Sequence, residues 1–130
     1  MRTTLVTLGV VAATLSVTSG AAPAADGGER AGGYTTYVAC STRASAKPAT
    51  ECRLSQTKAA FFRSNRHDAT YKVCVKFPGK KKRLCASAQP ADKGKTRFVT
   101  IATASLGTHK VRWYVGGKQV GSWNFDVTQG

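Results

Sequence analysis

The stretch YKVCVKFPGKKKRLC, residues 71–85, decides the fold class of this chain. Apolar and polar side chains alternate along its first half, which is the pattern of a β-strand with one buried face. The dipeptide Pro78-Gly79 then predicts a turn, and the chain returns through Leu84 and Cys85 to about Ala88. We therefore predict a β-hairpin, with Tyr71, Val73, Val75 and Phe77 on one face of its first arm and Lys72, Cys74 and Lys76 on the other.

The four cysteines of the chain predict disulfide bonds. An even number of cysteines in a small exported domain indicates a disulfide framework, and four cysteines allow three pairings. Proximity favours Cys40–Cys52 and Cys74–Cys85, since each pair flanks a turn-like segment. Each such bridge closes a loop of about ten residues and is worth about 3 kcal/mol of stability. A bridge between sheets, such as Cys40–Cys74, is the alternative.

An apolar segment near the N-terminus predicts a signal peptide over residues 1–25. Arg2 supplies the positive n-region, residues 5–17 supply the apolar h-region, and a run of small residues follows as a cleavage site. The apolar run is shorter than the roughly 20 residues of a membrane span, so cleavage is favoured over an uncleaved anchor. Residues 26–33 (DGGERAGG) predict a flexible tail. We therefore expect a secreted protein with no transmembrane segment and one domain over residues 34–130.

Short segments rich in β-formers alternate with turn signals along the rest of the chain, and no segment has a helical period longer than two turns. The consecutive Phe61 and Phe62 indicate a bulge or a change of face, and residues 89–95 are expected to form a loop. The pattern is typical of an all-β, antiparallel two-sheet sandwich of about seven strands. The predicted strands include residues 34–41, 57–64, 71–77, 84–88, 96–104, 108–115 and 118–128.

The last hairpin is the most clearly marked element of the chain. Val111 and Trp113 fall on one face of its first arm, with Lys110, Arg112 and Tyr114 on the other. Gly116-Gly117 supplies the positive-φ residues of a tight turn, and Gly121 marks a bulge in the returning strand.

The same region carries a resemblance to a known family. Residues 105–115 (SLGTHKVRWYV) and 120–127 (VGSWNFDV) resemble the closing strands of bacterial Ig-like domains. Those strands commonly read Leu-x-x-Gly-x-Tyr-x-Val-x-Trp, then a turn, Val-Gly-Ser and Phe-x-Val, and His109 stands at the tyrosine position. With its signal peptide and two small disulfide loops, the chain is similar to small secreted Ig-like proteins of actinobacterial type. The resemblance implies an Ig-like sandwich and assigns no activity.

Positive charge is the main chemical feature of the surface. The chain has 20 Lys and Arg residues against six Asp and Glu, a formal net charge of +14. Such a balance favours anionic partners, and a stapled loop loses less entropy than a free tail on binding. We predict contact with an anionic polymer or a partner protein, although a lysine-rich tip also protects a sheet edge from aggregation. The predicted anion-binding residues are Lys72, Lys76, Lys80, Lys81, Lys82 and Arg83.

Other functions have less support in the sequence. The carboxylates are isolated, the cysteines are expected to be paired, and two histidines without a free thiol make a poor zinc site. One outward tyrosine is not a stacking platform, so no specific nucleic-acid readout is expected. We therefore predict a monomeric, non-enzymatic binding module without cofactor or metal. An inhibitor or antagonistic effector that presents residues 42–51 between Cys40 and Cys52 is the alternative.

Overall fold

The computed structural model describes residues 29–30 and 32–130, so the predicted signal peptide and half of the predicted tail lie outside the described residues. The described chain forms ten β-strands and no helix. The strands are β1 (Glu29–Arg30), β2 (Tyr34–Ala39), β3 (Glu51–Arg53), β4 (Lys58–Ser64), β5 (Ala69–Lys76), β6 (Leu84–Cys85), β7 (Gln89–Ala91), β8 (Thr96–Ile101), β9 (Gly107–Val115) and β10 (Lys118–Thr128).

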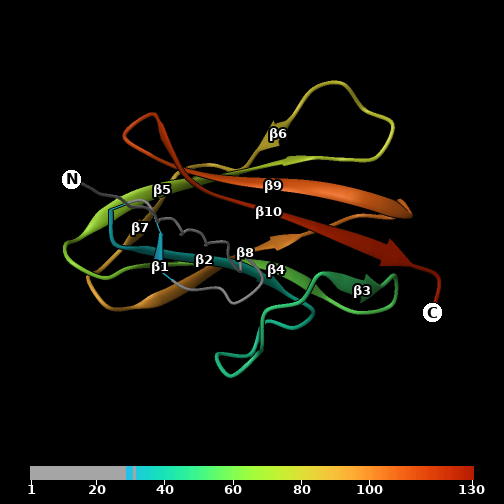
Figure 1. Cartoon of the computed structure of the whole chain (residues 1–130), viewed down its shortest axis with the longest axis horizontal. Coiled ribbons are helices and arrows are strands. Elements are labelled where there is room, and N and C mark those ends of the chain that lie inside the picture. The colour runs from blue at the N-terminus through green and yellow to red at the C-terminus, as the bar shows by residue number, and fades with distance from the viewer. Residues whose placement is uncertain (1–28, 31) are drawn as a thin grey trace, which may run out of the picture.

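The strands form two sheets, which can be followed as two layers in Figure 1. The first sheet has the order β1-β2-β4-β8, and the second has the order β3-β10-β9-β5-β6, with β7 also pairing with β5. The orders β2-β4-β8 and β10-β9-β5 match the A-B-E and G-F-C orders of immunoglobulin sandwiches. The predicted all-β, Ig-like two-sheet sandwich is confirmed.

Two details of that prediction were wrong. The structure has ten strands where seven were expected, because three further strands of two or three residues, β1, β3 and β7, extend the sheet edges. The pairing is not entirely antiparallel either, since β3 runs parallel to β10, with Cys52 opposite Val127.

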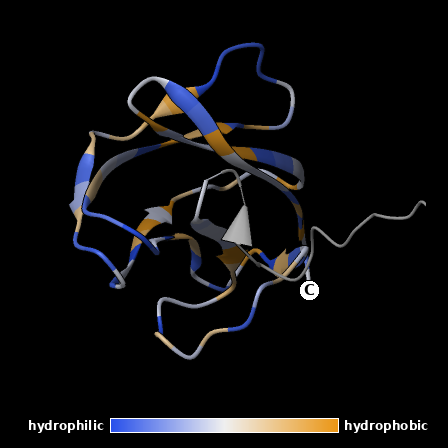
Figure 2. Cartoon of the chain, turned by 60° about the vertical axis from the view of Figure 1, so that its left-hand side comes forward, coloured by the Kyte–Doolittle hydropathy of each residue, from blue (hydrophilic) through white to orange (hydrophobic). Residues whose placement is uncertain are grey.

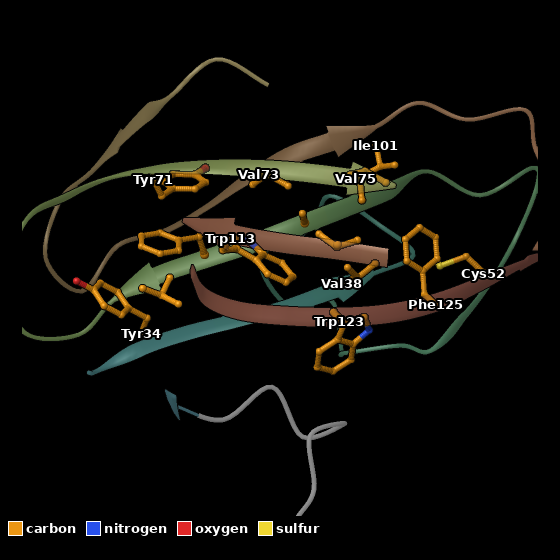
Figure 3. Close-up of a cluster of buried hydrophobic side chains, with 14 of the residues drawn as sticks. Tyr34, Val38, Cys52, Tyr71, Val73, Val75, Ile101, Trp113, Trp123 and Phe125 are labelled. Atoms are coloured by element: carbon orange, nitrogen blue, oxygen red, sulfur yellow. The ribbon is translucent and has the colours of Figure 1, made fainter. Parts of the chain in front are cut away.

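The core lies between the two layers and is built from alternate residues of the long strands. Trp113 on β9 is buried, as the alternation of the last hairpin predicts, and Phe125 on β10 is also buried. Tyr71 of β5 stacks on Phe62 of β4, with ring centroids 4.3 Å apart, so one aromatic pair links the two sheets. Figure 3 shows Tyr71 and Trp113 pointing into this space. Such a pair contributes about 0.5–1.5 kcal/mol beyond its buried area.

The bulge predicted at Gly121 is confirmed, because the register of β9 and β10 shifts between Gln119 and Gly121. A Cβ atom placed on Gly121 would lie 2.9 Å from Thr36 Cβ of the opposite sheet. Glycine is therefore required here by the close approach of the two sheets.

The irregularity expected at Phe61 and Phe62 is not present. Strand β4 pairs in continuous register with both β2 and β8. Phe62 enters the core, whereas Phe61 lies on the outer face of the first sheet, stacked on Tyr37 with centroids 5.0 Å apart. Both rings are buried because both faces of this strand are covered, and this explains the broken alternation.

Three further segments differ from expectation. Residues 89–91 form the edge strand β7 instead of a loop, with Pro90 opposite Thr70. Proline is tolerated there because an edge strand leaves one row of N–H groups without a ladder partner. The returning arm of the opening hairpin ends at Cys85 as β6, and Glu29–Arg30 of the predicted tail pairs with β2 as β1.

Candidate anion-binding surface

The two disulfides join Cys40 to Cys52 and Cys74 to Cys85, so the pairing of sequence neighbours is confirmed. Cys74 and Cys85 stand directly opposite each other on β5 and β6. Because β6 has only two residues, this disulfide holds the returning arm on β5. It also closes the loop of residues 77–83, which we call the basic loop.

The basic loop begins with the predicted turn. Lys80 N–H donates to the Phe77 carbonyl at 3.1 Å, and Gly79 has a φ of +74°. This is the geometry of a type II turn, in which glycine supplies the positive φ. The three lysines that follow, Lys80 to Lys82, are exposed. Figure 2 shows the loop as a hydrophilic projection from the sandwich.

The base of the basic loop packs on the start of β9. The Phe77 ring meets the His109 ring edge-on, with centroids 5.3 Å apart. A Cβ atom on Gly107 would lie 3.4 Å from Pro78, and Gly107 has a φ of +113°. The base of the loop is therefore fixed by packing and by the disulfide, while its lysine tip is in solvent.

His109 is the residue that joins this loop to the next connection of the sandwich. Its side chain is fully buried. Its Nδ1 lies 3.0 Å from the Gly107 carbonyl oxygen and its Nε2 lies 2.9 Å from Thr103 Oγ1. Since a carbonyl only accepts, Nδ1 carries the proton and Nε2 accepts from the threonine hydroxyl. This bond ties the start of β9 to the β8–β9 connection.

The environment of His109 favours its neutral form. Burial lowers the pKa of this imidazole, and the nearby Lys58 ammonium lowers it further. The hydrogen bond to Gly107 and the carboxylate of Asp126 act in the opposite direction. Lys58 is itself buried and donates to the Leu54 carbonyl at 2.8 Å, and burial lowers its pKa.

The six predicted anion-binding residues fall into two groups. Lys72 and Lys76 lie on the outer face of β5, and the lysines of the basic loop lie at its tip. Arg83 turns back toward the first group, because it lines the same surface pocket as Lys72 and Tyr114. Its Nε atom is buried and has no hydrogen-bond partner.

The structure adds two cations, Lys110 and Arg112, to the six residues predicted from the sequence. Strand β9 lies beside β5 with Lys110 opposite Lys76 and Arg112 opposite Cys74. Directly opposed like charges destabilise a sheet. The alternation of the last hairpin had placed Lys110 and Arg112 on its outer face, but only the strand register puts them next to the opening hairpin. We call these eight residues the basic surface.

No carboxylate of the described residues forms an ion pair with the basic surface. Asp68 accepts the backbone N–H of Lys93 at 2.8 Å, and Asp126 accepts from the Thr108 hydroxyl at 2.6 Å. These two carboxylates are therefore held by neighbouring donors of the sandwich.

Two hollows flank the basic loop. The first, of about 580 Å³, lies on the outer face of the second sheet over the Cys74–Cys85 disulfide and includes Lys72 and Tyr114. The second, of about 600 Å³, lies between the basic loop and the β8–β9 connection, and we call it the lysine cleft. Over residues 29–30 and 32–130, no group of three or more His, Cys, Asp or Glu residues is arranged to hold a metal ion.

No protein-family model and no curated protein matches this chain. In the part of the chain that the structure describes, no helix is long and apolar enough to cross a membrane. The fold and disulfides define a small, disulfide-bonded Ig-like sandwich.

Proposed function

We propose that this protein is a secreted, monomeric, non-enzymatic binding module that contacts an anionic polymer of the cell envelope through its basic surface. The observation that carries the proposal is the pairing of Lys76 with Lys110 across β5 and β9. Placing two ammonium groups opposite each other costs stability in the free protein. An external polyanion removes that cost when it binds.

The form of the basic loop also supports the proposal. The disulfide and the packing of Phe77 on His109 hold its base, so less conformational entropy is lost when its lysines engage a partner. Protection of a sheet edge would explain lysines next to β6. It does not explain Lys110 and Arg112, which lie on β9 between two neighbouring strands.

Retention on an immobilised polyanion tests the proposal. Linear polyphosphate on beads is the probe, and glutamine replaces the six residues Lys72, Lys76, Lys80, Lys81, Lys82 and Arg83. The matched control loses the same charge from exposed residues elsewhere, namely Arg43, Lys47, Lys93, Lys95, Arg97 and Lys118.

We expect the first variant to elute at much lower salt than the wild type, since counterion release scales with the number of contacts. The control variant should elute close to the wild type. Equal elution of the two variants would mean that net charge alone causes retention, and the proposal would fail.

A second candidate is an inhibitor that presents the loop of residues 42–51. Ala49 N–H donates to the Val38 carbonyl at 2.8 Å, so the end of this loop is fixed, while residues 42–45 are exposed. A fixed, exposed loop suits insertion into a protease cleft. Inhibition of secreted proteases at micromolar protein would support this candidate, and an absence of inhibition across a broad panel would exclude it.

A further inference from the structure

The lysine cleft has an apolar inner end that polyanion binding leaves unexplained. A narrower hollow of about 180 Å³ shares Phe77, Leu84 and Ala102 with it. This hollow reaches between the layers, where it is lined by Val75 of β5 and Val99 of β8. The two hollows together form a path from the exposed lysines to the edge of the core.

The path is open because the two sheets differ in width at this side. Leu84 is opposite Val75 in the ladder, so both side chains face the first sheet. Strand β8 is the edge of that sheet, and it does not reach far enough to cover Leu84, which remains 66% exposed. Leu84 and Phe77 therefore give both hollows an apolar lining where they meet.

Both walls of the lysine cleft are held by one residue. His109 packs against Phe77 on one wall and bonds to Thr103 on the other. Thr103 Oγ1 in turn accepts the backbone N–H of Ser105 at 3.1 Å. A cleft with fixed walls loses little entropy when a ligand enters, and its volume of about 600 Å³ lies in the usual range for ligand pockets.

We propose that the lysine cleft binds a single-chain amphiphile with an anionic headgroup. The headgroup lies among the ammonium groups of Lys80, Lys81 and Lys82, and the hydrocarbon chain covers Leu84 and Phe77. The chain end enters the narrow hollow, where the side chains of Val75, Val99 and Ile101 offer a sugar or a nucleotide no hydrogen-bond partner. This inference goes beyond the proposed function, because polymer contact requires the charges alone.

Calorimetric titration with dodecyl phosphate below its micelle concentration tests the inference. Inorganic phosphate and the neutral dodecyl maltoside are the two comparison probes. We expect dodecyl phosphate to bind in the micromolar range, and each comparison probe to bind at least about tenfold more weakly because it lacks the chain or the charge. If inorganic phosphate bound as tightly as dodecyl phosphate, ion pairing at the surface alone would explain the binding. If dodecyl maltoside bound as tightly, apolar adsorption alone would explain it. Either result overturns the inference.

Variants separate this inference from the proposed function. Leu84→Gln changes an exposed side chain and should weaken dodecyl phosphate binding about tenfold, while polyphosphate retention stays unchanged. The matched control is Leu106→Gln, since Leu106 is 49% exposed and outside the lining of the cleft. An unchanged affinity in Leu84→Gln overturns the inference. Replacing Lys80, Lys81 and Lys82 with Gln together should weaken the binding of both dodecyl phosphate and polyphosphate.

The cleft could instead receive a second copy of the chain, and light scattering distinguishes this occupant. We expect the mass of a monomer at all concentrations. A dimer that Leu84→Gln abolishes would assign the cleft to self-association and overturn the inference. A different outcome would reject the proposed function alone. In that outcome, the six-residue variant and its control elute from polyphosphate at the same salt, but dodecyl phosphate still binds and still depends on Leu84.

Discussion

The two disulfide loops of this protein have nearly the same length but lie differently on the sandwich. Their cysteines are 12 and 11 residues apart. The first loop folds back on the body, where the Ala49 carbonyl accepts Trp123 Nε1–H and the Thr50 carbonyl accepts Asp126 N–H. The basic loop is packed only at its base, and its tip projects. The disulfide sets the size of a loop, and the partners available to its backbone and side chains decide whether it joins the body or extends from it.

The largest effect is expected when each disulfide is removed in turn. Cys40→Ala with Cys52→Ala, and Cys74→Ala with Cys85→Ala, should each lower the free energy of unfolding by about 3 kcal/mol. Only the second pair should weaken polyphosphate binding, because the Cys74–Cys85 disulfide holds the basic loop, whereas no residue of the basic surface lies in the first loop. Denaturant unfolding and bead retention below the melting transition measure the two effects. Equal loss of binding in both variants would contradict the separate roles of the loops.

A smaller effect is expected when the first loop loses its anchor. Trp123→Phe keeps most of the buried ring but removes the donor to the Ala49 carbonyl, 2.8 Å away. The unsatisfied carbonyl should cost about 1–2 kcal/mol. Amide hydrogen exchange should accelerate in residues 47–51 and stay unchanged in residues 77–84. Faster exchange in both loops would show that they are coupled.

Acid should act on the basic loop through His109. The folded-state pKa of His109 is below its ordinary value of about 6.5, chiefly because of burial. Protonation therefore favours the unfolded chain: this contribution to stability is complete above about pH 6.5 and is lost as the pH falls toward the folded pKa. His109→Gln should be less stable than the wild type at neutral pH, but its stability should not fall as the pH drops below about 6.5. A wild-type stability that is flat between neutral pH and the onset of carboxylate protonation would contradict the assignment.

The smallest effect is expected at the opposed pair of lysines. Lys76→Gln should raise the free energy of unfolding by no more than about 0.5 kcal/mol at low salt, because it relieves repulsion from Lys110. The gain should disappear at high salt, where the charges are screened. The same variant should bind polyphosphate more weakly. Lys118→Gln, at the exposed β9–β10 turn, is the control and should change neither property.

The sequence predicted those parts of the fold in which one face of a strand is buried. Alternation assigned the faces of β5 and β9, and Gly116-Gly117 and Gly121 located the turn and the bulge. Prediction failed where neighbours override local pattern. Residues 89–95 were expected to form a loop, but β5 supplies a pairing partner for residues 89–91. Phe61 and Phe62 broke the alternation because both faces of β4 are covered.

The candidate site was predicted in part for the same reason. The lysine run around the Pro78-Gly79 turn is visible in the sequence because its residues are contiguous. Lys110 and Arg112 join it only through the register of β5 and β9. The lysine cleft is present because β8 ends before it covers the basic loop. No local sequence pattern predicts where β8 ends relative to that loop. The partnership of His109 with Thr103 likewise appears only after the corner is folded.

The most direct test of polyanion binding by the basic surface is an amide chemical-shift titration with short-chain polyphosphate. Shifts should be confined to residues 72–84 and to Lys110 and Arg112, and they should weaken as salt is raised. The exposed residues of the first disulfide loop, including Arg43 and Lys47, should not move. Shifts of equal size in both loops, or none in residues 72–84, would contradict the assignment of the basic surface as the binding site.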